Sequence, residues 1–227
     1  MSLPSTAPTI QACPNCGAGA PLGVPFCPQC TKILPLQRQT DYFSFLGLPR
    51  KLNIDAATLD ERFRALSRQF HPDYFYNATT AERRASLERS SYLNDAYRTL
   101  RQPVARIEYV LKLEGLAPKG PEEASRQVPP ALLEEVFALN EELDEIRDLR
   151  ASGSPPDVWR RRLERARQPI DAKRVDHETE LQDLAARWDA GASESDRRQV
   201  LEALRDRFLE RNYIANLLAG IERELNS

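Results

Sequence analysis

The sequence lacks several features that mark common functional classes. No apolar run approaches the roughly 18 residues that a membrane-spanning helix needs. Lys and Arg (32 residues) nearly balance Asp and Glu (34 residues), so the basic excess typical of nucleic-acid-binding proteins is missing. The chain has only two histidines, and it shows no glycine-rich phosphate loop and no Ser/His/Asp set. We therefore predict a protein that acts by binding and not as an enzyme.

The beginning of the chain also lacks the marks of a targeting segment. Residues 1–12 contain no arginine and no long apolar core, so they are predicted to be a disordered lead. They match neither a secretory signal nor an organelle transit peptide. The expected compartment is the cytoplasm of a bacterium.

Cysteine is scarce, but its four copies form two Cys-x-x-Cys pairs within a predicted module at residues 13–36. The spacing matches a tetrahedral thiolate site and predicts structural zinc bound by Cys13, Cys16, Cys27 and Cys30. So short a segment cannot bury a core, so the metal must supply its folding energy. Iron in a rubredoxin-like centre is the alternative metal. Two disulfides would not suit a reducing compartment, and a thioredoxin-type redox pair would need a βαβ pattern that is missing.

Helical patterns occupy the chain from residue 41 onward, and the predicted fold class is all-α outside the cysteine module. A short helix is predicted within 41–49, with Tyr42, Phe45 and Leu46 on one face. Asp55 should cap a longer basic amphipathic helix. Thr79 should open the next helix with a capping box. The apolar stripes of the two long helices favour an antiparallel pair.

The tripeptide His71-Pro72-Asp73 stands between these two helices. Proline disfavours the helical conformation for the residue before it, so a turn is predicted there. A helix, an exposed His-Pro-Asp loop and an antiparallel helix resemble the J domain, the module that switches the ATPase of DnaK-type chaperones. An ordinary loop histidine and a merely solvated arginine face are the plainer interpretations of the same residues.

The C-terminal half reads as a separate helical domain. Residues 115–128 are predicted to be a linker because they combine glycine and proline with polar residues. Residues 129–227 carry three amphipathic patterns joined by short turns, which favours a three-helix bundle. Pro169 is expected to kink or split the middle helix. His177, Trp159 and Trp188 fall at core positions of these patterns.

The order of these parts resembles one family. The motifs that carry the resemblance are Asp41-Tyr42-Phe43, Gly47-Leu48-Pro49, His71-Pro72-Asp73, Arg101-Gln102-Pro103, Arg106-Ile107-Glu108-Tyr109 and Glu141-Glu142-Leu143-Asp144-Glu145-Ile146. They are similar to HscB, the J-type co-chaperone of iron–sulfur cluster assembly, and the cysteine module resembles the zinc-binding extension of its mitochondrial-type members. The resemblance implies an L-shaped protein with a J domain at 40–114 and a scaffold-binding bundle at 129–227.

The resemblance also implies two partners: a DnaK-type ATPase chaperone, often the dedicated HscA, and the cluster scaffold protein IscU. The implied chaperone-binding residues are His71, Pro72, Asp73, Arg62, Arg64 and Arg68. The implied scaffold-binding residues are Leu133, Glu134, Phe137, Ala138, Glu141 and Phe208. Three positions depart from the family pattern. Tyr74 replaces the usual lysine after the aspartate, Glu134 replaces an apolar residue, and Ala138 replaces an acidic one.

Two other functions fit parts of the sequence. A generic J protein that serves other clients would differ only in what residues 129–227 bind. A zinc-ribbon regulator would bind nucleic acid through the cysteine module, but the knuckles contain few basic residues, and Lys32 lies only beyond the second pair. Phe137 and Phe208 are themselves ambiguous, because an aromatic residue beside an apolar stripe fits either a core or a binding patch.

Overall fold

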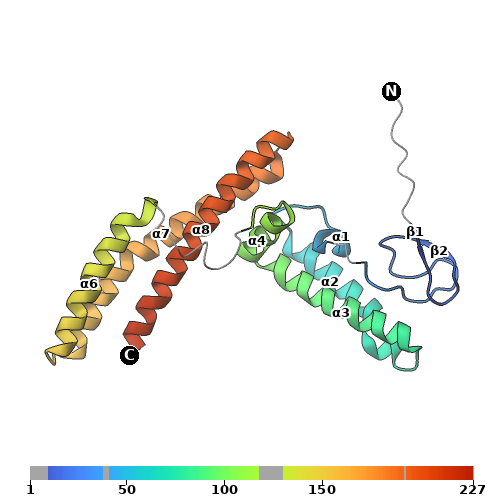
Figure 1. Cartoon of the computed structure of the whole chain (residues 1–227), viewed down its shortest axis with the longest axis horizontal. Helices are drawn as coiled ribbons and strands as arrows, with labels where there is room; N and C mark the ends of the chain where they lie inside the picture. The colour runs from blue at the N-terminus through green and yellow to red at the C-terminus, as the bar shows by residue number, and fades with distance from the viewer. Residues whose placement is uncertain (1–9, 38–40, 118–129, 192, 227) are drawn as a thin grey trace. The chain divides into compact units, whose positions relative to one another are not determined.

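The computed structural model describes residues 10–37, 41–117, 130–191 and 193–226, and it divides into two compact units, Met1–Arg106 and Ile107–Ser227. The predicted all-α class is confirmed, since the elements described beyond one small two-stranded sheet are helices (Figure 1). Residues 1–9 of the predicted disordered lead and most of the predicted linker 115–128 lie outside the described residues. Within the described part, no helix has both the length and the apolar character to cross a membrane.

The first unit begins with the cysteine module. Strand β1 (Ile10–Ala12) pairs antiparallel with β2 (Gly19–Pro21), with Gln11 opposite Ala20. The prediction of disorder for residues 1–12 is therefore wrong at residues 10–12. The two strands lie on either side of the first cysteine pair in the sequence. A strand of three residues is too short to show the alternation of apolar and polar residues by which strands are predicted. Its small core contains Cys13, Ala20, Cys27 and Leu34.

A helical hairpin forms the rest of this unit. Helix α1 (Tyr42–Leu46) precedes α2 (Ala56–Phe70), and a 3-10 turn η1 (Pro72–Phe75) leads to α3 (Thr80–Arg101). The side chain of Asp55 caps α2 by accepting from the Thr58 amide at 2.8 Å. Thr79 and Glu82 form the predicted capping box of α3. The predicted stripes meet in the interior, where the buried members are Leu59, Phe70, Leu93, Ala96 and Leu100.

Helix α1 buries a different face from the one predicted. Phe43 and Leu46 are buried, whereas Tyr42 and Phe45 are only partly covered. The two partly covered rings each contact Tyr92 of α3 at a centroid distance of 5.0 Å. A helix of five residues has too few turns to define an apolar stripe, so its rotation follows from the surface on which it packs.

Helix α4 (Pro103–Leu113) begins at the proline that ends the α3 pattern, and the unit boundary falls within it. Arg106 is buried at its start, and its Nε donates to the Leu100 carbonyl at 2.6 Å. The same guanidinium donates to the Leu52 carbonyl. The arginine therefore satisfies carbonyls at the end of α3 and in the loop before α2.

The second unit contains three long helices: α6 (Leu133–Ala151), preceded by a 3-10 turn η2 (Pro130–Leu132), α7 (Pro156–Ala190) and α8 (Glu194–Asn226). Helix α6 packs on α7, and α7 packs on α8. Trp159, Trp188 and His177 are buried as predicted. Pro169 does not split the middle helix, because α7 continues through it. A proline costs a helix one backbone hydrogen bond, and burial of the flanking Leu163 and Ile170 opposes a break at that point.

Candidate functional site

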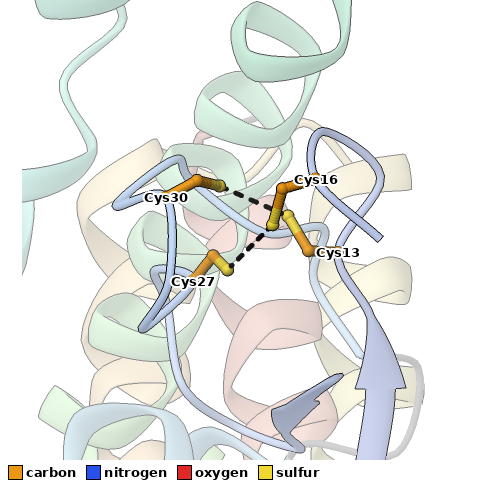
Figure 2. A group of neighbouring side chains, drawn as sticks. All are labelled: Cys13, Cys16, Cys27 and Cys30. Carbon is orange, nitrogen blue, oxygen red and sulfur yellow. Dashed lines mark hydrogen bonds between the residues drawn. The ribbon is translucent and has the colours of Figure 1, made fainter. Parts of the chain in front are cut away.

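Four sulfur atoms converge in the N-terminal module (Figure 2). The Cys13 Sγ lies 3.6 Å from the Cys30 Sγ, and the Cys16 Sγ lies 3.8 Å from the Cys27 Sγ. The four sulfurs all lie within 4.8 Å of one another. A disulfide would hold two sulfurs about 2.05 Å apart, so the disulfide alternative is wrong.

The two knuckles share one backbone design. The amide of Gly17 donates to the Cys13 carbonyl at 2.9 Å, and the amide of Thr31 donates to the Cys27 carbonyl at 2.9 Å. Gly17 has φ +74° and Thr31 has φ +58°, so both residues adopt the left-handed conformation directly after the second cysteine of a pair. Gly17 does so at no steric cost, whereas Thr31 shows that the second knuckle is held against a backbone preference.

These residues fit a tetrahedral metal ion. With metal–sulfur bonds of about 2.3 Å, neighbouring sulfurs in a tetrahedron lie about 3.8 Å apart, which agrees with both observed contacts. The Lys32 amide and the Asn15 side chain lower the pKa of the Cys30 thiol to about 6. The Ala18 amide lowers the pKa of Cys16, but burial and the neighbouring sulfurs raise it overall to about 12. The pKa values of Cys16 and Cys30 are thus shifted in opposite directions, and a bound cation would favour the thiolate form of both and release their protons.

The His-Pro-Asp loop lies at the connection between α2 and α3, and it is more ordered than a plain turn. His71 ends α2 and also caps η1, because its Nδ1 accepts from the Asp73 amide at 3.4 Å. The same Nδ1 lies 3.5 Å from the Asp73 carboxylate. The Asp73 side chain is 86% exposed and the His71 side chain is 51% exposed. The tripeptide is therefore an accessible, hydrogen-bonded turn that exposes a carboxylate to solvent.

Aromatic side chains extend this exposed surface. Tyr74 is 72% exposed and Tyr76 is 78% exposed. The Tyr74 ring meets the His71 ring edge-on at a centroid distance of 6.1 Å. Tyr74 is the residue that departs from the family pattern, and Tyr76 was not among the predicted site residues. Arg62, Arg64 and Arg68 are exposed on α2, so the helix before the loop has a basic outer face as expected.

In the second unit, α6 exposes most of the residues that the resemblance assigns to scaffold binding. The exposed members are Leu133, Glu134, Phe137, Ala138 and Glu141. Phe137 is 65% exposed, an unusual position for a large aromatic ring. Beside it lies an open groove of about 520 Å³ between α6 and α7, whose lining includes Ala138, Arg162 and Pro169.

Phe208 does not belong to this surface. It is 3% exposed on α8, so the expectation that it completes a patch with Phe137 is wrong. It also lies outside the core cluster that packs against α6. The apolar stripe of α8 contains Leu201, Leu204 and Phe208, and burial of that stripe takes the ring inward.

One buried arginine of α3 is not among the site residues predicted from the sequence. Arg89 of α3 is 3% exposed, and its guanidinium reaches carbonyls of the cysteine module. A signal was available in the sequence, since Arg89 continues the spacing of Ala85, Leu93 and Ala96 on the buried face. An arginine within an apolar stripe indicates a specific buried partner.

The comparisons with known proteins agree with these observations. No protein-family model matches the chain. Among solved structures, the crystal structure of the human co-chaperone protein HscB matches with a TM-score of 0.69 and 25% identity, over 94% of this chain and 98% of that chain. The chain has the fold of the HscB family. The chaperone HscB from Vibrio cholerae matches with a TM-score of 0.54 and 27% identity, over 82% of this chain and 98% of that one. The HscB resemblance inferred from the sequence motifs is thereby confirmed, together with its tetracysteine cluster.

Proposed function

We propose that this protein is a co-chaperone of iron–sulfur cluster assembly, which stimulates the ATPase of a DnaK- or HscA-type chaperone and delivers an IscU-like scaffold protein to it. The observation that carries the proposal is the exposed His71-Pro72-Asp73 loop at the connection of a helical hairpin, within a chain similar to two HscB structures. The J-domain boundaries 40–114 and the bundle boundaries 129–227 are part of the proposal.

The chaperone is engaged through the loop and the basic face of α2. The exposed Asp73 carboxylate accepts hydrogen bonds from the chaperone, while Arg62, Arg64 and Arg68 meet an acidic surface. Contacts of this kind accelerate ATP hydrolysis only if they are stronger in the hydrolysis-competent conformation of the chaperone than in the other one. The hydrogen bond from the Asp73 amide to His71 Nδ1 restrains the backbone of the loop, which reduces the entropy lost on docking.

The scaffold is engaged through α6. Phe137 and Leu133 lie four residues apart on one exposed face, with Glu134, Ala138 and Glu141 around them. An exposed aromatic anchor with a polar rim suits a transient complex, because a few such residues carry most of the binding energy at an interface. A delivery protein needs an interface of this moderate strength, since it must also release its cargo.

The four cysteines hold structural zinc, with iron as the alternative metal. Zinc, when bound, supplies the folding energy that a module of this size cannot obtain from its own core. Cys13, Cys16, Cys27 and Cys30 provide a complete four-sulfur shell. A closed shell favours a structural role, because a catalytic metal keeps a position for water or substrate.

A pull-down from lysate with and without ATP tests the proposal. We expect recovery of a DnaK-type ATPase that depends on nucleotide, and of a cluster scaffold that does not. Recovery of the ATPase with unrelated clients would favour a generic J protein. If neither partner is recovered and the protein gives a salt-sensitive gel shift with nucleic acid, the result would support the zinc-ribbon regulator.

A further inference from the structure

The cysteine module and the loop end of the hairpin are packed against each other within the first unit. The Phe26 ring lies 6.2 Å from the Phe70 ring, measured between centroids. Phe70 is the residue directly before His71, and it is fully buried. The module therefore contacts the residue on which the His-Pro-Asp loop begins.

Arg89 forms the second connection. Its Nε donates to the Leu34 carbonyl at 2.8 Å, and its Nη2 donates to the Pro35 carbonyl at 3.2 Å. Its guanidinium carbon also lies 5.4 Å from the centre of the Phe70 ring. Arg89 is 3% exposed, and this burial lowers the pKa of its guanidinium to about 10. A buried cation needs its acceptors, so α3 depends on the module being folded.

Lys32 forms the third connection. Its Nζ lies 3.0 Å from the Glu82 carboxylate, and Glu82 is the buried acid of the α3 capping box. Lys32 follows the second knuckle directly, and its carbonyl accepts from the Cys27 amide at 2.9 Å. The position of Lys32 is thus set by the knuckle that a metal ion would hold closed.

The backbone of Phe70 is also held in place, by two serines of α3. Ser86 Oγ and Ser90 Oγ donate to the Phe70 carbonyl at 2.8 Å and 2.7 Å. The ring of Phe70 is held by Phe26 and Arg89, and its carbonyl is held by the two serines. A shift of the module would therefore move or loosen the residue from which the loop departs.

We propose that the metal-loaded cysteine module braces the His-Pro-Asp loop, with Arg89 as the positioning residue, so that metal occupancy and loop order are coupled. The effect that this coupling would have on the chaperone rests on the proposed function. Without metal the module loses its folding energy, and Arg89 loses the Leu34 and Pro35 carbonyls. Coupling is reciprocal, so a change at Arg89 must in turn weaken metal binding.

The test compares the full-length zinc-loaded protein with Arg89→Ala, Arg89→Lys and the matched control Arg84→Ala. Arg84 lies on the same helix and is 81% exposed. Zinc affinity is measured by competition with a chelator. We expect Arg89→Ala to weaken zinc binding about tenfold, within the range of ordinary coupling between sites. Arg89→Lys should recover part of the loss, since it keeps the charge and loses the fork that spans two carbonyls, and Arg84→Ala should bind zinc normally. Equal zinc affinity in all four proteins would overturn the proposal.

A second measurement uses the wild-type chain and needs no chaperone. Amide hydrogen exchange is followed before and after the metal is removed by a chelator. We expect exchange to accelerate at least severalfold in the last turn of α2 and the first turn of α3, with α8 unchanged. Unchanged exchange at the loop end, or equal acceleration in α8, would count against the brace.

ATPase stimulation is the third measurement. If the zinc-loaded protein stimulates a DnaK-type chaperone, the metal-free protein should stimulate less, and equal stimulation by the two forms contradicts the consequence for the chaperone. If neither form stimulates it, the proposed function fails, and the brace is judged by zinc affinity and exchange alone.

Discussion

The buried Glu82 side chain links the capping box of α3 to the cysteine module. It accepts from the Thr79 amide at 3.1 Å and from the Thr79 hydroxyl at 2.8 Å, and it pairs with Lys32. Burial alone raises the pKa of Glu82, but the Thr79 donors and Lys32 outweigh burial and lower the pKa below its usual value of 4.5. The charged form is therefore the one that stabilises the folded state.

The sign of the pH dependence follows from that lowered pKa. The contribution of Glu82 to stability is fully present above about pH 4.5 and is lost as the pH falls through its folded-state pKa. At pH 7, Glu82→Gln should be less stable by about 0.5–2 kcal/mol, the usual range for a helix cap. The difference from wild type should shrink below pH 4, as measured by urea unfolding. Glu61→Gln, an exposed change on α2, is the control. A difference that stays constant with pH would contradict the role given to this carboxylate.

Substitutions of Phe137 and Phe208 should affect different properties of the second unit, scaffold binding in one case and folding stability in the other. Phe137→Ala should leave the unfolding midpoint unchanged and weaken scaffold binding by about 2 kcal/mol, as measured by titration calorimetry. Phe208→Ala should destabilise the fold by about 3–5 kcal/mol, because it removes a buried ring. Normal scaffold binding by a folded Phe137→Ala variant would place the scaffold surface elsewhere.

At the scale of elements, the cysteine module depends on metal, whereas the long helices have apolar cores of their own. The cluster around α6 includes Val136, Leu139, Leu163 and Ile214, none of which involves the cysteines. The helical hairpin has its own interior, with Leu59, Leu93 and Leu100 buried. Loss of the metal should therefore be felt in the module and at the adjoining loop end, and not throughout the chain.

Cys27→Ser tests this division. The variant should lose its metal, for which elemental analysis of wild type should give about one zinc per chain. Far-UV circular dichroism should change by only a small fraction, because the helices persist without the module. Global unfolding of the variant would contradict the independence of the helical cores. A strong visible absorption band in freshly purified wild type would identify iron in place of zinc.

At the scale of the whole molecule, local signals in the sequence predicted much of the structure. Asp55 and Thr79 cap helices as predicted, because each acts on the residues beside it. The four cysteines were predicted to form a cluster because their spacing along the chain is that of a known type of metal site. Phe208 belongs to the apolar stripe of α8, so its burial could have been predicted from periodicity. The strand at residues 10–12 and the rotation of α1 depend instead on contacts with β2 and with α3. Propensity and periodicity carry little information about such contacts.

The candidate sites divide in the same way. The His71-Pro72-Asp73 loop was predicted from its own motif, whereas the α6 residues were named because of the resemblance to HscB, and the structure exposes both sets. The spacing of α3 indicated that Arg89 is buried, but it could not indicate the partners, because the Leu34 and Pro35 carbonyls lie more than fifty positions earlier in the chain. The resemblance to HscB supplied the rest of the functional assignment, which the geometry alone does not contain.

The proposed function depends on activation of a DnaK-type ATPase by the His-Pro-Asp loop. The most direct measurement is single-turnover ATP hydrolysis by that chaperone with wild type, His71→Gln and the control Glu164→Gln, an exposed change in the second unit. We predict that His71→Gln returns the rate to the unstimulated value while its helicity stays normal, because the loop is exposed and His71 orders Asp73. The control should stimulate like wild type. Full stimulation by a folded His71→Gln variant would contradict the account.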